Sequence, residues 1–130
     1  MRLLNTSLAL SCCLLPLLLP AKTIDVYIGT AKDGGILHAT LDSASGALSP
    51  TTQVAEVNGA GFIVAHPNRQ NLYTLAHTLE TKLGSVASFK INPDKSLSPI
   101  NTQSSEGTNP CHISIDATGK TALVANYNSH

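Results

Sequence analysis

The residue in this chain that is best suited to chemistry is His112, which follows an Asn-Pro-Cys sequence at residues 109–111. An imidazole gains or loses a proton near neutral pH, so it can act as a general base or donate a hydrogen bond to a bound oxygen. A histidine beside a loop can instead hydrogen-bond the neighbouring backbone and hold structural units together. Structural histidines are the commoner kind, so the sequence favours this second role for His112 and leaves the catalytic one open.

The other candidate side chains favour structural roles. Cys111 is the only cysteine after residue 21, and we expect it to be a small buried residue because no base is placed to form its thiolate. His66 and Asp116 each begin a polar turn, where a side chain can hydrogen-bond turn amides. Arg69, the only arginine after Arg2, lies in one of these turns, where we expect a solvated charge.

The sequence contains no recognisable motif for a bound metal or phosphate. His38 and His77 have no partner at the spacing of metal ligands, and His130 is the last residue. No phosphate-binding glycine loop and no Ser-His-Asp arrangement with a nucleophile elbow is found in the sequence. We therefore expect neither a metal site nor another cofactor.

The elements that position these side chains are repeated. Residues 62–76 return about fifty positions later as residues 112–126, and in both copies a polar turn, HPNRQN or DATGK, separates two apolar runs. The two further repeated pairs are residues 36–42 with 86–92 and residues 47–50 with 96–99. A period of about 45–50 residues with four strand-like runs is typical of β-propeller blades.

Alternation of apolar and polar residues predicts an all-β fold, and no segment after residue 21 has the 3.6-residue period of a helix. The expected strands are residues 24–30, 36–42, 48–57, 62–65, 72–76, 84–91, 97–103, 112–115 and 122–126. Their order predicts the second, third and fourth strands of one blade, then a whole blade, then two strands of a third. Propellers have about 4–8 blades, so we expect about two blades of a partial propeller.

Residues 1–21 are typical of a secretory signal peptide. Arg2 supplies a positive charge, a leucine-rich apolar run follows, and a small residue, Ala21, stands at the expected cleavage point. The alternatives are a retained membrane anchor, which two prolines in the run disfavour, and a lipoprotein signal ending at Cys12. We expect cleavage and a secreted or periplasmic product without a stable membrane span.

The charge of the remaining chain argues against nucleic acid as a partner. Residues 22–130 carry seven basic and eight acidic side chains, and the basic ones form no stripe along the sequence. A protein that binds nucleic acid usually carries a clustered excess of Lys and Arg. We therefore expect no nucleic-acid partner, and the oligomeric state is left open.

Several motifs resemble one known family, the seven-bladed β-propeller lactonases. They are VYIGT at residues 26–30, the turn at residues 42–48, NPCHISID at residues 109–116 and VANY at residues 124–127. This family includes bacterial 6-phosphogluconolactonases and fungal carboxymuconate cyclases. The resemblance covers nearly all of residues 24–130 and implies that residues 22–130 are the N-terminal part, about a third, of such a propeller.

The resemblance implies that a sugar lactone is hydrolysed to its acid, or that the related lactone-forming cyclisation occurs, in a funnel at the centre of the ring. The family's proposed histidine, glutamate and arginine set lies mainly in later blades, so the resemblance implies no activity for this fragment alone. It leaves His112 as the catalytic candidate here and a small-molecule lactone as the substrate. The alternative is a non-enzymatic exported propeller that binds a ligand or protein partner across the ring.

Overall fold

The computed structural model describes residues 22–31, 34–77 and 83–129. The predicted signal peptide, part of the turn before residue 34, the polar loop at residues 78–82 and His130 lie outside the described residues. Within the described ranges the chain forms nine strands and no helix, as predicted from its alternating pattern. Nor does any of these three stretches contain a helix of the length and hydropathy that a bilayer crossing needs.

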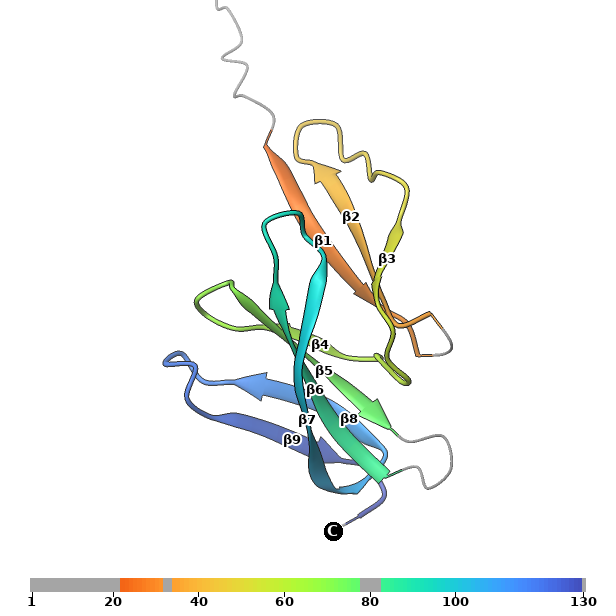
Figure 1. Cartoon of the computed structure of the whole chain (residues 1–130), viewed down its shortest axis with the longest axis vertical. Coiled ribbons are helices and arrows are strands. Elements are labelled where there is room, and N and C mark those ends of the chain that lie inside the picture. Colours follow the sequence, from red (N-terminus) through yellow and green to blue (C-terminus); the bar gives the residue numbers. More distant parts are fainter. Residues whose placement is uncertain (1–21, 32–33, 78–82, 130) are drawn as a thin grey trace, which may run out of the picture.

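The strands form three antiparallel sheets, each ordered as in the sequence (Figure 1). The first sheet contains β1 (Thr23–Gly29), β2 (Ile36–Asp42) and β3 (Thr52–Ala55). The second contains β4 (Ile63–Ala65), β5 (Asn71–His77), β6 (Leu83–Ile91) and β7 (Leu97–Thr108), and the third contains β8 (Pro110–Ile115) and β9 (Ala122–Asn126). The predicted sequence of three, four and two strands is therefore confirmed.

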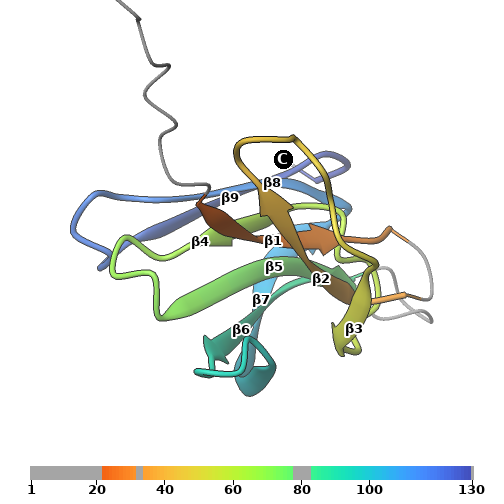
Figure 2. The same ribbon diagram turned by 90° about the horizontal axis from the view of Figure 1, so that it is seen from above.

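The three sheets follow one another as the blades of a partial propeller do. Figure 1 shows the first sheet at the top, the third at the bottom and the second between them. Strands β4 and β8, the first strands of their sheets, contact each other on the inner side of this stack, β1 contacts β4, and β3 contacts β7. Figure 2 shows the same stack from above. This arrangement places the starts of β4 and β8, and hence Phe62 and His112, side by side.

The sequence repeat extends to the backbone conformation. Three pairs of equivalent positions share a left-handed φ: Gly46 with Lys95 (73° and 71°), Gly59 with Asn109 (80° and 55°), and Arg69 with Gly119 (59° and 74°). A non-glycine residue in this conformation carries a strain of about 1 kcal/mol or more. The turns are therefore the same in successive blades even where glycine has been replaced.

Two strand boundaries differ from the prediction. The expected strand at residues 48–57 shortens to β3, because Pro50 has no amide hydrogen to donate and Leu48 makes only an isolated bridge with Leu41. The expected strands at residues 97–103 and 112–115 lengthen to β7 and β8, so the polar residues expected to form a loop between them are mostly strand. Strand β7 continues because β6 offers it a ladder as far as Leu83, and as the last strand of its sheet it carries polar side chains without penalty.

The largest buried cluster joins the first two sheets. Ile36 of β2 is fully buried together with Leu72 of β5 and Phe89 of β6, and small residues such as Ala76 and Ala87 complete the cluster. Alanines let the two sheets approach closely, while each large buried side chain contributes about 1.5–3 kcal/mol. The composition, with few aromatic residues, predicts a core of Val, Ile, Leu and Ala. The buried cluster contains Ile, Leu and Ala together with Phe89, whereas Val54 and Val57 are only partly buried against it.

Polar links join neighbouring sheets at their turns. The Lys95 ammonium, in the β6–β7 turn, lies 2.8 Å from a carboxylate oxygen of Asp25 in β1, and the Tyr27 hydroxyl donates to the Lys95 carbonyl at 3.0 Å. His38 contacts the second oxygen of Asp25 at 3.0 Å. The hydrogen bond from Lys95, together with that of His38, holds the pKa of Asp25 below 3.8 despite partial burial.

This ion pair gives a pH-dependent prediction. Because the pKa of Asp25 is lowered on folding, its contribution is present above pH 3.8 and is lost as the pH falls through the lowered value. We expect Asp25→Asn to lower stability at neutral pH by less than about 1 kcal/mol, since solvent screens this partly exposed pair. The difference from the native chain in thermal unfolding should shrink towards zero near pH 2 and in high salt. A difference that stays constant with pH would contradict the assignment.

Candidate functional site

His112 lies at the start of β8, on the inner side of the stacked sheets. Pro110 is the first residue of this strand, a position where its missing amide hydrogen costs little, and the ladder with β9 shifts register between Pro110 and His112. The His112 ring packs edge-on against the Phe62 ring, with centroids 4.5 Å apart and an interplanar angle of 61°. Positions fifty residues apart in the sequence thus form one ring pair across two sheets.

The imidazole of His112 is exposed, and among the described residues its contact is this ring and no hydrogen bond. An edge-to-face pair fixes the orientation of both rings and contributes about 0.5–1.5 kcal/mol beyond the buried area. Both ring nitrogens therefore remain free to accept a proton or to donate a hydrogen bond to a ligand on the inner side.

Residues 56–62, which lead into β4, and residues 106–112, where β7 ends and β8 begins, are called here the leading loops after their equivalent place in the repeat, although the second is mostly strand. They are equivalent in the repeat, and each begins with a glutamate, Glu56 or Glu106. Sequence reasoning missed these carboxylates, although their spacing of fifty residues was a readable signal. Each leading loop therefore begins with an acidic side chain, and the second one ends at His112.

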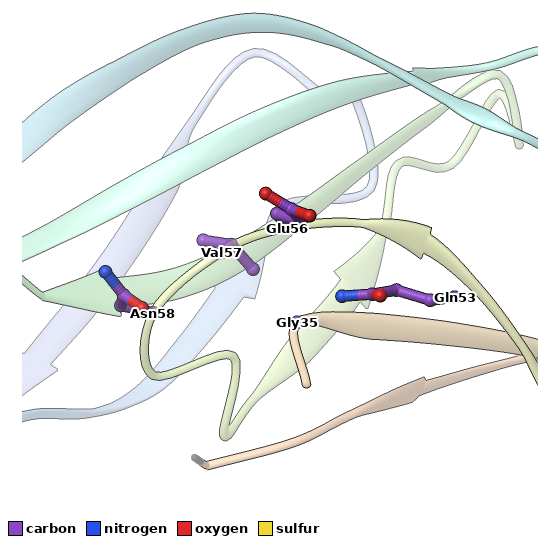
Figure 3. Close-up of a pocket in the computed structure, with 5 residues that line it drawn as sticks. All are labelled: Gly35, Gln53, Glu56, Val57 and Asn58. Carbon is purple, nitrogen blue, oxygen red and sulfur yellow. The ribbon is translucent and has the colours of Figure 1, made fainter. Parts of the chain in front are cut away.

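A cavity of about 360 Å³ lies beside the first leading loop. Glu56, Val57 and Asn58 line it together with Gln53 of β3 and Gly35, the residue before β2 (Figure 3). The side-chain amide of Gln53 donates to the carbonyl of Gly34 at 3.0 Å, which fixes it at the wall. A carboxylate and two amides around an open cavity are groups that bind the hydroxyls of a polyhydroxy compound.

The first leading loop is held by close backbone packing against β1 and β5. A side chain at Gly29, the last residue of β1, would place its Cβ 1.9 Å from the carbonyl oxygen of buried Ala60. On the other side, the His77 amide donates to the Asn58 carbonyl at 3.1 Å, and the His77 ring lies against Gly59. These contacts fix the loop that carries Phe62.

His66 and Asp116 have structural roles, as predicted. Nδ1 of His66 accepts from the Asn68 amide at 3.1 Å, so its Nε2 carries the hydrogen and donates to the Gly119 carbonyl of the next sheet at 3.1 Å. Asp116 accepts hydrogen bonds within its own turn, and the one from the Thr118 hydroxyl is the main reason that its pKa lies below the ordinary value. The turns of neighbouring blades are linked in this way.

The remaining candidates are placed as follows. Cys111 is exposed, which corrects the expectation of a buried thiol: it is the extra residue at the register shift of β8, and its sulfur lies 3.5 Å from the Ala125 carbonyl. Arg69 is exposed in the β4–β5 turn, at the far end of β4 from the leading loops. In the described part of the chain, no three His, Cys, Asp or Glu side chains are grouped closely enough to share a metal ion.

Successive antiparallel sheets with equivalent turns and inner strands define a β-propeller. A family model described as "Lactonase, 7-bladed beta-propeller" matches residues 25–130, and the chain belongs to this family.

Individual relatives agree with this assignment. The chain is 31% identical to a 6-phosphogluconolactonase of Bacillus subtilis, over 79% of this chain and 30% of that protein. It is 33% identical to a 6-phosphogluconolactonase of Formosa agariphila, over 78% of this chain and 30% of that protein. The fold is similar to that of the periplasmic gluconolactonase of Pseudomonas aeruginosa, with a TM-score of 0.74 and 20% identity over 82% of this chain and 31% of that one. The chain thus spans 30% of the length of the curated relatives it matches.

The contact between Gly29 and Ala60 gives a prediction about the leading loop. We expect Gly29→Ala to destabilise the chain by about 2–3 kcal/mol, because the added methyl group meets a buried backbone oxygen that cannot move alone. Gly61→Ala is the matched control: its Cβ would lie 3.8 Å from the nearest atom, so we expect a change within about 0.5 kcal/mol. Chemical denaturation of the two variants measures both values, and equal stabilities would contradict the packing.

Proposed function

We propose that the protein carrying this chain hydrolyses a sugar lactone to its acid and that His112 acts on the substrate. Membership of the lactonase family and relatives named 6-phosphogluconolactonase support this activity. The observation that carries the role of His112 is its exposed imidazole on the inner side of the stack, oriented by Phe62. An exposed ring on an inner strand is available to a substrate held at the centre of a propeller.

Lactone hydrolysis requires a base and a later acid. Water attacks the lactone carbonyl carbon as a base removes its proton, and the tetrahedral intermediate then expels the ring oxygen, which takes up a proton. The His112 imidazole can perform both transfers, because a histidine ring can take up the proton of the attacking water and then return it to the departing ring oxygen. Phe62 offers the C–H face of the sugar an apolar surface beside the imidazole.

Stabilisation of the oxyanion requires a cation or several hydrogen-bond donors. Arg69 does not supply it in this proposal, since Arg69 lies in the turn beyond the far end of β4. The chain spans 30% of its curated relatives, so we expect the missing donors to come from outside residues 22–130. Residues 22–130 alone should accordingly have no lactonase activity.

Export forms part of the proposal. The pattern of residues 1–21 supports a cleaved signal peptide and a secreted or periplasmic product. The similar fold of a protein named a periplasmic gluconolactonase agrees with that location. Phosphorylated gluconolactone is made inside cells, so an exported enzyme of this family would act on an unphosphorylated sugar lactone.

A non-enzymatic propeller that binds a ligand or protein partner is the second candidate. The observation that favours it concerns His112: catalytic bases are usually oriented by a third polar group, and the described residues place only Phe62 against the ring. A binding protein needs no such group. The two candidates differ in whether the wild-type protein hydrolyses a lactone at all.

The test uses a form of the protein as long as its relatives and measures D-gluconolactone hydrolysis by acid release, with the spontaneous rate subtracted. We expect His112→Ala to lower kcat/KM by about 10²–10⁴-fold without changing the melting temperature, as for loss of a general base. His66→Ala is the matched control: it removes a turn hydrogen bond, so it should lower the melting temperature and leave turnover near normal. Near-normal turnover of His112→Ala would exclude the catalytic role, and a wild-type protein without lactonase activity would favour the binding protein.

A further inference from the structure

A second groove lies between the first two sheets, at the end of the strands away from the leading loops. Its volume is about 510 Å³, within the range of small-molecule sites. It is reached from the start of β1, the β4–β5 turn and the β6–β7 turn, which contribute Lys22, Arg69 and Lys95 respectively. The groove is therefore separate from the inner surface where His112 and Phe62 lie.

The groove has an excess of positive charge. Lys22, Arg69 and Lys95 line it against a single carboxylate, Asp25, which already binds Lys95 at 2.8 Å and His38 at 3.0 Å. The side chains of Lys22 and Arg69 have no acidic partner among the described residues. This concentration of positive charge is notable in a sequence whose basic and acidic side chains balance. An anion entering the groove would therefore meet two cations, Lys22 and Arg69, that no described acidic side chain neutralises.

The wall of the groove between these cations is apolar. Ala65, at the end of β4, lies beside buried Leu72 of β5 and partly buried Ile91 of β6. The Tyr27 ring also lines the groove, and its hydroxyl is held by the Lys95 carbonyl at 3.0 Å. The groove thus offers an apolar surface bordered by donors, a combination that binds a ligand with one charged end and an apolar body.

Arg69 distinguishes the β4–β5 turn, which borders this groove, from the equivalent β8–β9 turn. Its backbone has φ 59°, and the matching position in the β8–β9 turn is Gly119, which adopts the same conformation without a side-chain penalty. A guanidinium at this strained position adds a planar donor pair that fits a carboxylate with two hydrogen bonds.

We infer that this groove binds a small organic carboxylate with an apolar body, whose carboxylate contacts Arg69 and whose body covers Leu72 and Ile91. This ligand is distinct in chemistry from a sugar lactone, which is uncharged and carries hydroxyl groups around its ring. The inference does not depend on lactonase activity, because none of these residues is assigned to the reaction.

The probe is 4-phenylbutyrate, titrated into the isotopically labelled chain and followed by amide chemical shifts. We expect saturable shifts at Leu72 and Ile91 with a Kd on the order of 1 mM. Arg69→Asn should weaken binding about fivefold or more, because asparagine tolerates the left-handed backbone while the charge-assisted bonds are lost. Lys120→Asn is the matched control: it removes one positive charge from the equivalent turn of the next blade, outside the groove, and should leave Kd unchanged.

Two comparison ligands separate the expected result from its alternatives. The alcohol 4-phenylbutanol keeps the apolar body without the charge, and gluconate keeps the carboxylate without the apolar body. We expect both to bind at least fivefold more weakly than 4-phenylbutyrate. Equal binding of the alcohol, equal binding of gluconate, equal weakening by Lys120→Asn, or no shift at Leu72 and Ile91 would each overturn the inference.

Discussion

The structure depends on the burial of sheet faces between successive sheets. When both faces of a small sheet carry apolar side chains, both are unfavourable in water, so each must pack against another element. Ile36 of the first sheet is completely buried in one cluster with Leu72 and Phe89 of the second, while Ile113 of the third sheet is 1% exposed. The stacking direction that buries these residues also aligns β1, β4 and β8, and so decides which side chains can meet at the inner side.

The contacts at the two ends of the strands therefore differ. At one end, turns are joined across sheets by His66 with Gly119 and by Asp25 with Lys95, which fixes the spacing of the blades. At the other end, the close packing of Gly29 against Ala60 fixes the first leading loop, and the His112 imidazole stays exposed. The lactone site that we propose lies at this second end, and the groove lined by Arg69 lies at the first end.

Most of the fold could be predicted from the sequence repeat, because equivalent turns impose equivalent backbone conformations and therefore equivalent strands. The features that the repeat did not predict each have a physical reason. The end of β7 reads as a polar loop because a strand at the edge of a sheet has no apolar pattern, and only its ladder with β6 reveals it. The exposure of Cys111 follows from a register shift that alternation does not encode. Glu56 was missed although its spacing of fifty residues from Glu106 could be read in the sequence, because only the fold shows that Glu56 lines a cavity.

The contact between Phe62 and His112 tests the central claim most directly, since it exists only if the second and third sheets stack as described. Nuclear Overhauser effects between the two rings should be strong, because their centroids lie 4.5 Å apart. Tyr27 and His38, whose centroids are 5.1 Å apart within the first sheet, provide an internal reference. We predict ring-to-ring effects for both pairs. An effect for Tyr27 with His38 and none for Phe62 with His112 would show that the sheets form but do not stack, and would contradict the account.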